Sequence, residues 1–348
     1  MVQKQTVKLG FRPVVIGRRL LDVLPERSRD VVVSRFGLAE NPERMTLEAI
    51  GDVYDVTRER IRQIENHAIG LVRKSDVFRR EGAVFDELQR VIEELGGLIA
   101  EHELLTLLGR DESARNHIHL LLVLGEPFVK LREDDEFHHR WHVGAARAEA
   151  VETALRALAG RLERSDLVSD ADLVGMFLEE LERVPAVEPR EDFARRYLGV
   201  SKMIGRNPLG EWGHALSPNV RAKGVRDYAF LAIRRHGSPM HFTEVAQEIT
   251  RLFGRAAHEA TCHNELIKDS RFVLVGRGLY ALSEWGYAGG VVRDVIREVL
   301  KRYGPLARGE LVEKVLKERY VKENTVVVNL ENPKYFKKSS DGTYTAAA

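Results

Sequence analysis

Apolar residues recur three and four positions apart through most of the chain, which is the spacing of amphipathic helices. The pattern predicts two helices within residues 12–37, separated at Leu24-Pro25, where proline suits the first turn of the second helix. A loop at Asn41-Pro42 follows. Residues 46–74 then have the pattern of a helix, a tight turn and a second helix. These four helices are predicted to form an N-terminal helix-turn-helix domain.

The second helix of residues 46–74 has two different faces. Counting about 100° per residue from Arg58, polar side chains fall between about 0° and 180°, and these are Arg58, Glu59, Arg62, Gln63, Asn66 and His67. The apolar residues Ile61, Ile64, Ala68, Leu71 and Val72 fall between about 220° and 320°. Thr57 is predicted to be the N-cap. An apolar ridge of the preceding helix and turn is predicted from Leu47, Ile50, Val53 and Val56. The polar face carries groups that can make bidentate hydrogen bonds to base edges in a DNA major groove.

A plan of three helices closed by a β-hairpin recurs about four times after Lys74, at intervals of roughly 65 to 75 residues. The hairpins are predicted from alternating apolar residues around turns such as Gly276-Arg277-Gly278 and Asp341-Gly342. The predicted fold class is mainly α, with tandem helix-turn-helix and winged-helix modules and short β-hairpin wings. We predict a helix-turn-helix domain at 1–80, followed by winged-helix modules at 81–146, 147–222, 223–286 and 287–348.

Composition narrows the class of protein. The content of 44% hydrophobic and 31% charged residues is typical of a soluble globular protein. No apolar run is long enough for a signal peptide or a membrane span, so we expect a cytoplasmic protein without a membrane partner. The single cysteine excludes a disulfide framework and a multi-cysteine zinc site.

Charge is distributed unevenly along the chain. Residues 1–80 carry 16 Lys and Arg against 11 Asp and Glu, a net charge of +5. Residues 81–220 carry 16 against 27, a net −11, and residues 221–348 carry 22 against 15, a net +7. Basic ends on either side of an acidic middle suggest that the ends face nucleic acid, although solvated helix faces would give the same pattern.

Three runs of the N-terminal residues are distinctive, LPERSRD (24–30), RFGL (35–38) and DVTRERIRQIE (55–65). Together they resemble region four of the primary sigma factors of bacterial RNA polymerase. The resemblance implies that Arg58, Glu59, Arg62 and Gln63 read the −35 promoter element in the major groove of double-stranded DNA. It further places phosphate contacts at Thr57, Arg60, His67, Arg73 and Lys74. Arg35, Phe36 and Leu38 lie where the family meets the β flap of RNA polymerase, although an apolar core role suits them as well.

A second resemblance, to the HARE-HTH family of winged helices, covers residues 225–284. Its matching runs are GSPMH (237–241), RFV (271–273) and VGRGLYAL (275–282). Members of that family are associated with DNA as a group. Wing contacts with DNA are predicted for Arg277, Lys337 and Lys338. The acidic tip at 133–136 would repel phosphate, so that module is expected to meet protein instead.

No catalytic, metal-binding or cofactor motif is recognisable, and we expect neither an enzyme, nor a cofactor, nor a small-molecule substrate. The promoter-melting regions of a complete primary sigma factor have no counterpart, so we do not expect a self-sufficient initiation factor. The predicted function is a sequence-specific, sigma-like transcription factor that reads a −35-type element and contacts RNA polymerase. The alternatives are a regulator that competes with sigma at the β flap and a nucleoid or DNA-repair accessory protein.

Overall fold

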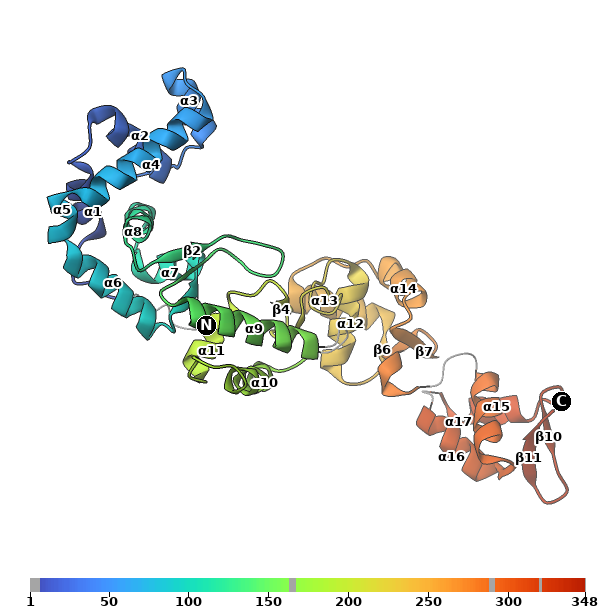
Figure 1. Cartoon of the computed structure of the whole chain (residues 1–348). Coiled ribbons are helices and arrows are strands. Elements are labelled where there is room, and N and C mark those ends of the chain that lie inside the picture. The colour runs from blue at the N-terminus through green and yellow to red at the C-terminus, as the bar shows by residue number, and fades with distance from the viewer. Residues whose placement is uncertain (1–6, 163–166, 288–291, 319–320, 348) are drawn as a thin grey trace. The chain divides into compact units, whose positions relative to one another are not determined.

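The computed structural model describes residues 7–162, 167–287, 292–318 and 321–347 (Figure 1). Within these residues 17 α-helices account for 57% of the chain, and 11 short strands form small antiparallel sheets. The prediction of a mainly helical fold is therefore confirmed. The chain divides into two compact units, the first formed by Met1–Glu163 with Val168–Gly205 and the second by Arg164–Leu167 with Arg206–Ala348.

The first unit begins with the four predicted helices and a short fifth one. They are α1 (Pro13–Leu21), α2 (Glu26–Phe36), α3 (Leu47–Tyr54), α4 (Arg58–Lys74) and α5 (Asp76–Arg80). Val31, Ile50 and Ile61 are buried together and join α2, α3 and α4. The placement of Val53 in the apolar ridge was wrong, because its side chain is 69% exposed. The ridge therefore depends on Ile50, with Leu47 and Val56 partly buried beside it.

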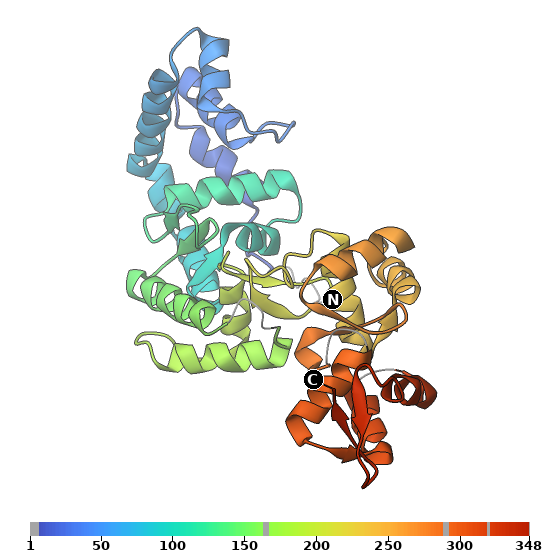
Figure 2. The same ribbon diagram turned by 90° about the vertical axis from the view of Figure 1, so that its right-hand side faces the viewer.

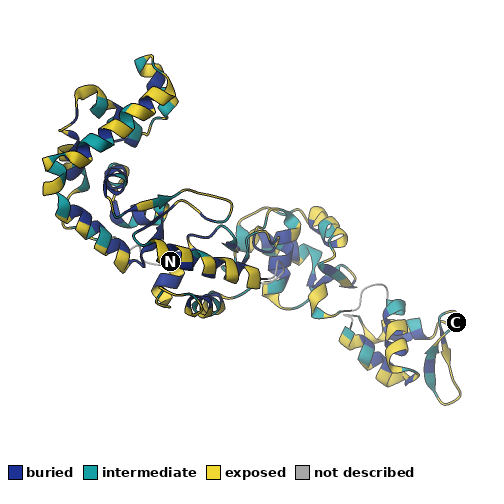
Figure 3. Cartoon of the chain, viewed as in Figure 1, coloured by how far each residue is buried: buried dark blue, intermediate teal, exposed yellow. Residues whose placement is uncertain are grey.

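The next helices and strands pack directly on this domain. They are α6 (Gly82–Glu94), β1 (Leu98–Ala100), α7 (Glu101–Leu108), α8 (Glu112–Leu124), β2 (Val129–Leu131) and β3 (Arg140–His142). Helix α8 contacts α1, α2, α4 and α7, and one apolar core extends from Ile16 to Trp141. The burial colours of Figure 3 show α8 as mostly buried. The predicted boundary between residues 80 and 81 thus does not separate two cores.

Three parts of the chain share one order of elements. The order of α6 to β3 recurs first in α12 (Val225–His236), β6 (Met240–His241), α13 (Phe242–Phe253), α14 (Glu259–Lys268), β7 (Phe272–Gly276) and β8 (Leu279–Leu282). It recurs again in α15 (Val292–Tyr303), β9 (Leu306–Ala307), α16 (Arg308–Glu318), α17 (Glu323–Leu330), β10 (Phe336–Lys338) and β11 (Thr343–Ala346). The predicted hairpins β2–β3, β7–β8 and β10–β11 are confirmed, and Figure 2 shows the last of them as a pair of arrows near the C-terminus.

Each of these hairpins carries a third strand that the sequence did not predict. The first strand of each set pairs with the last, so the sheet orders are β1-β3-β2, β6-β8-β7 and β10-β11-β9. The short strands β1, β6 and β9 each begin directly after a glycine or proline in the turn that follows the preceding helix. Each hairpin is thereby fastened to the start of its second helix.

Helices α9 (Ala145–Arg161), α10 (Asp170–Glu182) and α11 (Glu191–Leu198) follow the positions expected for the second module after the domain. Strands β4 (Ile204–Arg206) and β5 (Trp212–His214) pair in a two-stranded sheet. The Tyr197 hydroxyl donates to Gly96 O at 2.5 Å, and Arg196 forms an ion pair with Glu103 at 2.8 Å. Helix α11 is therefore joined to the segment around β1 within one unit.

The acidic tip at 133–136 is neutralised within the chain. Glu133 pairs with Lys202 at 2.9 Å, and Glu136 pairs with Arg156 at 2.7 Å. Phe137 at the end of the tip is fully buried. Asp134 also pairs with Arg140 at 3.4 Å, so three of the four carboxylates of the tip have partners. Because the loop also has its own apolar anchor, the tip lies folded against its own unit.

Candidate nucleic-acid interface

The start of α4 is held by a cap and a close-packed turn. The Thr57 hydroxyl oxygen accepts from the Arg60 amide at 3.3 Å, which confirms Thr57 as the N-cap. The turn before it passes through Asp55 in the left-handed region, with φ of 50°. The Val56 amide donates to Gly51 O at 3.0 Å, and a Cβ added to Gly51 would lie 2.5 Å from Val56 O. A glycine is therefore required where α3 meets the turn.

The two faces of α4 are as predicted. Ile61, Ala68 and Val72 are buried, whereas Arg58, Glu59, Arg62 and Gln63 are exposed. Asn66 and His67 continue the exposed polar face one turn further along. The structure thus brings all four predicted base-reading side chains together on the open side of one helix.

The exposed side chains of α4 bind one another in the free protein. Arg62 donates to the Glu59 carboxylate through Nε at 2.9 Å and through Nη2 at 2.7 Å. The pKa of Glu59 is lowered, first by the hydrogen bond from Arg62. Arg60 donates to Gln63 Oε1 at 3.1 Å, and the Arg58 side chain makes no hydrogen bond or ion pair with any residue that the structure describes. These pairs occupy the groups that hydrogen bonds to base edges would use.

The predicted phosphate contacts have different surroundings. His67 and Lys74 are exposed, and His67 lines a cavity of about 240 Å³ together with Arg27, Arg60 and Gln63. Arg27 was not among the predicted site residues, because it lies on α2 and no local spacing relates it to α4. Its guanidinium carbon lies 5.4 Å from the centre of the Tyr54 ring, a cation–π contact. Arg27 is therefore a cation beside the recognition face that the local sequence pattern did not predict.

Arg73 is engaged elsewhere. Its Nε donates to Leu124 O at 3.0 Å and its Nη2 to Val123 O at 2.6 Å. Both carbonyls belong to the last turn of α8, where the helix leaves its acceptors without internal partners. A phosphate contact by Arg73 would have to replace these hydrogen bonds.

The residues aligned with the flap-binding face are used inside the chain. Phe36 and Leu38 are 5% and 6% exposed and belong to the core that includes α8. Arg35 donates to Met45 O at 3.1 Å and lies 3.7 Å from the Glu65 carboxylate. Of the two roles considered for the apolar pair, the structure supports the core role.

The predicted wing residues of the second unit are exposed. Arg277 lies in the turn between β7 and β8, whereas Lys337 and Lys338 lie on strand β10 and not at the tip of its turn. Arg271 has an internal role, because it pairs with Asp227 at 2.9 Å and with Asp269 at 2.7 Å. Basic side chains of this unit are thus found both in partly buried ion pairs and on the exposed surface.

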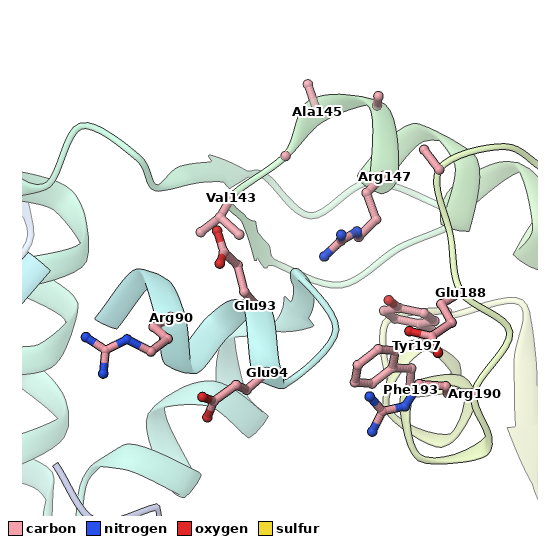
Figure 4. Close-up of a pocket in the computed structure, with 13 residues that line it drawn as sticks. Arg90, Glu93, Glu94, Val143, Ala145, Arg147, Glu188, Arg190, Phe193 and Tyr197 are labelled. Atoms are coloured by element: carbon pink, nitrogen blue, oxygen red, sulfur yellow. The ribbon is translucent and has the colours of Figure 1, made fainter. Parts of the chain in front are cut away.

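Other kinds of site are less well supported. A cavity of about 630 Å³ in the first unit is lined by arginines and glutamates of α6, α9 and the loop before α11, and by two aromatic residues of α11 (Figure 4). Over the described ranges, no three or more His, Cys, Asp or Glu residues are grouped so that they could hold a metal ion. No helix in the described part of the chain is long and apolar enough to span a membrane.

Comparison with known proteins agrees with the geometry of α3 and α4. The family described as Sigma-70, region 4 matches residues 20–74. RNA polymerase sigma factor RpoS of Coxiella burnetii is 45% identical over 71 residues, which are 20% of this chain and 19% of that protein. RpoD of Helicobacter pylori is 50% identical over 54 residues, 16% of this chain and 8% of its own length. SigA of Nostoc is 49% identical over 55 residues, 16% of this chain and 14% of its own length.

The chain spans less than a fifth of the length of these curated relatives. The similarity falls on α1 to α4, the part with the capped recognition helix and the buried contact of Ile50 with Ile61. The N-terminal segment, residues 20–74, is a sigma-70 region 4 domain with a DNA-binding helix-turn-helix.

Proposed function

We propose that this protein is a sequence-specific DNA-binding transcription factor whose helix α4 enters the major groove of a −35-type promoter element. The proposal is carried by the exposed polar face of α4 within a region 4 domain. Arg58 and Arg62 would each donate two hydrogen bonds to guanine, and Glu59 would accept one from cytosine. Gln63 would bind the adenine edge.

Binding to DNA exchanges one set of partners for another. The Glu59–Arg62 pair is exposed on both sides, with 55% and 54% of the side chains accessible, so water and salt weaken it. Releasing it therefore costs little compared with the hydrogen bonds that the base edges would supply. Thr57, Arg60, His67 and Lys74 are proposed phosphate contacts, and Arg27 joins them from α2. Such contacts position the helix and make the affinity fall steeply with salt.

The downstream modules are proposed to be winged helices that add DNA or protein contacts, with residues 225–284 similar to HARE-HTH. Support comes from their shared order of helix, strand, two helices and hairpin. Arg277, Lys337 and Lys338 are the proposed wing contacts, since all three are exposed. No enzymatic activity is proposed.

The test measures binding of the full chain to a duplex with a −35 element and to a scrambled duplex of equal length. Arg62→Ala and Gln63→Ala are expected to weaken binding to the −35 duplex about tenfold or more and to leave scrambled binding nearly unchanged. Arg80→Ala is the matched control, because it removes an exposed positive charge from α5. Equal affinity of the unaltered protein for both duplexes would overturn specific reading.

RNA polymerase is the proposed second partner. A contact through the face of Phe36 and Leu38 would require α8 to move away, since both residues are buried. We therefore place the polymerase contact on the remaining surface. A regulator that competes with sigma would be favoured instead if this protein captures core polymerase, if sigma displaces it, and if Arg58→Ala leaves the capture unchanged.

Removal of residues 206–348 tests the remaining alternative, a nucleoid or DNA-repair accessory protein. These residues, with Arg164–Leu167, form the second unit, which has its own apolar cores. The remaining first unit is expected to keep its preference for the −35 duplex. Loss of all DNA binding would favour a nucleoid or repair accessory protein.

A further inference from the structure

A cavity of about 590 Å³ lies in the first unit between the region 4 domain and the helices that follow it. Arg35 and Arg44 line it from α2 and the loop before α3, and His119 lines it from α8. Lys130 and Arg132 line it from β2 and the next loop. We call it the basic cavity. Its volume is within the range of small-molecule sites in proteins.

Positive charge dominates the basic cavity. Arg35, Arg44, Lys130 and Arg132 face a single lining carboxylate, that of Glu65. Glu101 lies behind the lining and pairs with Lys130 at 2.5 Å. Four positive and two negative charges leave a net charge of +2.

The cavity of Figure 4 is a useful contrast. Its lining combines three arginines, Arg90, Arg147 and Arg190, with three glutamates, Glu93, Glu94 and Glu188. That cavity has no net charge and favours neither anions nor cations. Charge imbalance therefore distinguishes the basic cavity from a hollow of similar size in the same unit.

Two of the arginines are held in position by the fold. Arg44 donates through Nε to Asn116 Oδ1 at 2.8 Å, and Arg35 donates through Nη1 to Met45 O at 3.1 Å. Burial lowers the pKa of Arg44, and the like charge of Arg35 adds to this effect. Arg132 makes no side-chain hydrogen bond or ion pair with the described residues. Fixed guanidinium groups lose little entropy when they bind a ligand.

The imidazole of His119 lines the basic cavity without adding a charge to it. Burial lowers its pKa to about 3, with the charge of Arg44 contributing, so the ring is uncharged at neutral pH. Its Nε2 lies 3.4 Å from the Lys130 ammonium and 3.6 Å from Glu101 Oε2. Nδ1 has no hydrogen-bond partner among the described residues.

We propose that the basic cavity binds a small phosphorylated molecule. A phosphate group carries up to two negative charges and accepts forked hydrogen bonds from guanidinium groups, which matches the net charge and the arginines here. Phe36 adds an apolar wall. Glu65 is the α4 residue that lines the cavity, and it lies away from the base-reading face, so the site is independent of the proposed DNA contacts.

The experiment is titration calorimetry of the full chain with inorganic phosphate, pyrophosphate and ATP, without magnesium and at constant ionic strength. We expect saturable binding of at least one probe with one site per chain. Arg132→Gln should weaken that binding about tenfold or more, because it removes a charged hydrogen bond. Since Arg132 is exposed, its replacement should leave the fold intact.

Arg110→Gln is the matched control, an exposed arginine of the same unit that does not line the cavity, and it should bind the probe as the unaltered protein does. Lys130→Gln provides a second test within the cavity and should also weaken binding. Chloride added at the same ionic strength distinguishes oxyanion binding at a site from general charge screening, and it should compete poorly with the probe, whereas equal competition by chloride would overturn the proposal. Absence of binding at millimolar probe, equal loss in Arg110→Gln, or no loss in either cavity variant would overturn the proposal.

Discussion

Replacing Asn116 by alanine tests whether the region 4 domain and the helices behind it form one body. The Asn116 side chain is 3% exposed, and its amide donates to Gly37 O and to Pro42 O, both at 2.9 Å. Its carbonyl oxygen accepts from Arg44 Nε at 2.8 Å. Alanine would remove all three hydrogen bonds between α8 and the loop that leads to α3.

The expected loss of stability in Asn116→Ala depends on how accessible each hydrogen-bond partner of Asn116 is to water. Gly37 O is buried and would lose its partner, at a cost of about 1–3 kcal/mol. The other two bonds are partly buried, and water can replace part of what they lose. We expect the local free energy of opening to fall by roughly 2–4 kcal/mol in all.

Amide hydrogen exchange measures this local opening directly, because a multi-module chain need not unfold in one step. The Leu38 and Met45 amides, bonded to Val33 O and Ser34 O, report on the loop. In Asn116→Ala they should exchange roughly thirty- to several-hundredfold faster. Asn41→Ala is the control, since Asn41 is an exposed residue of the same loop. If both variants exchange alike, α8 does not hold the loop.

Two further predictions concern glycine and histidine positions. Gly51→Ala should destabilise the helix-turn-helix by about 1–3 kcal/mol, because the added Cβ would clash with Val56 O. Gly70→Ala should instead stabilise α4 by about 0.5–1 kcal/mol, because no atom lies near the added Cβ and alanine favours the helix. Thermal unfolding that shifts in the same direction for both variants would contradict this reasoning. The pKa of His119 is lowered to about 3 in the folded protein, so between pH 6.5 and 3 the ring binds a proton in the unfolded chain but not in the folded one. The free energy of unfolding of the first unit should therefore fall as the pH drops from about 6.5 towards 3. His119→Gln should flatten this dependence in denaturant titrations at several pH values, and an unchanged slope would refute the assignment.

The packing of α8 determines which faces of the region 4 domain are exposed. The side chains Phe36 and Leu38 and the Arg73 guanidinium are used to hold α8. The polar face of α4 that is proposed to read bases remains exposed. The domain therefore presents its DNA-binding side while an internal helix covers the side that the resemblance assigns to polymerase.

Much of the fold was predictable from local pattern. The helices of the first 80 residues and the hairpins around Gly276–Gly278 and Asp341-Gly342 follow from period, caps and turn residues, which act between neighbours in the chain. Thr57 and Gly51 show why the helix-turn-helix was the clearest feature, since each acts on atoms within five residues. Val53 was misplaced because a periodic position shows only which face a residue shares, and not whether anything covers that face.

The sequence by itself determined that the chain is mainly helical and that one helix presents Arg58, Glu59, Arg62 and Gln63 on a single face. Only the tertiary structure decided what the other basic residues do. Arg44 meets Asn116 across 72 residues of chain, and Arg73 meets Leu124 across 51. Such contacts depend on which apolar surfaces pack together. Most residues of α8 are buried, so its sequence has no single apolar face from which the helices that it contacts could be predicted. The basic cavity exists because that packing gathers charges that are scattered along the sequence.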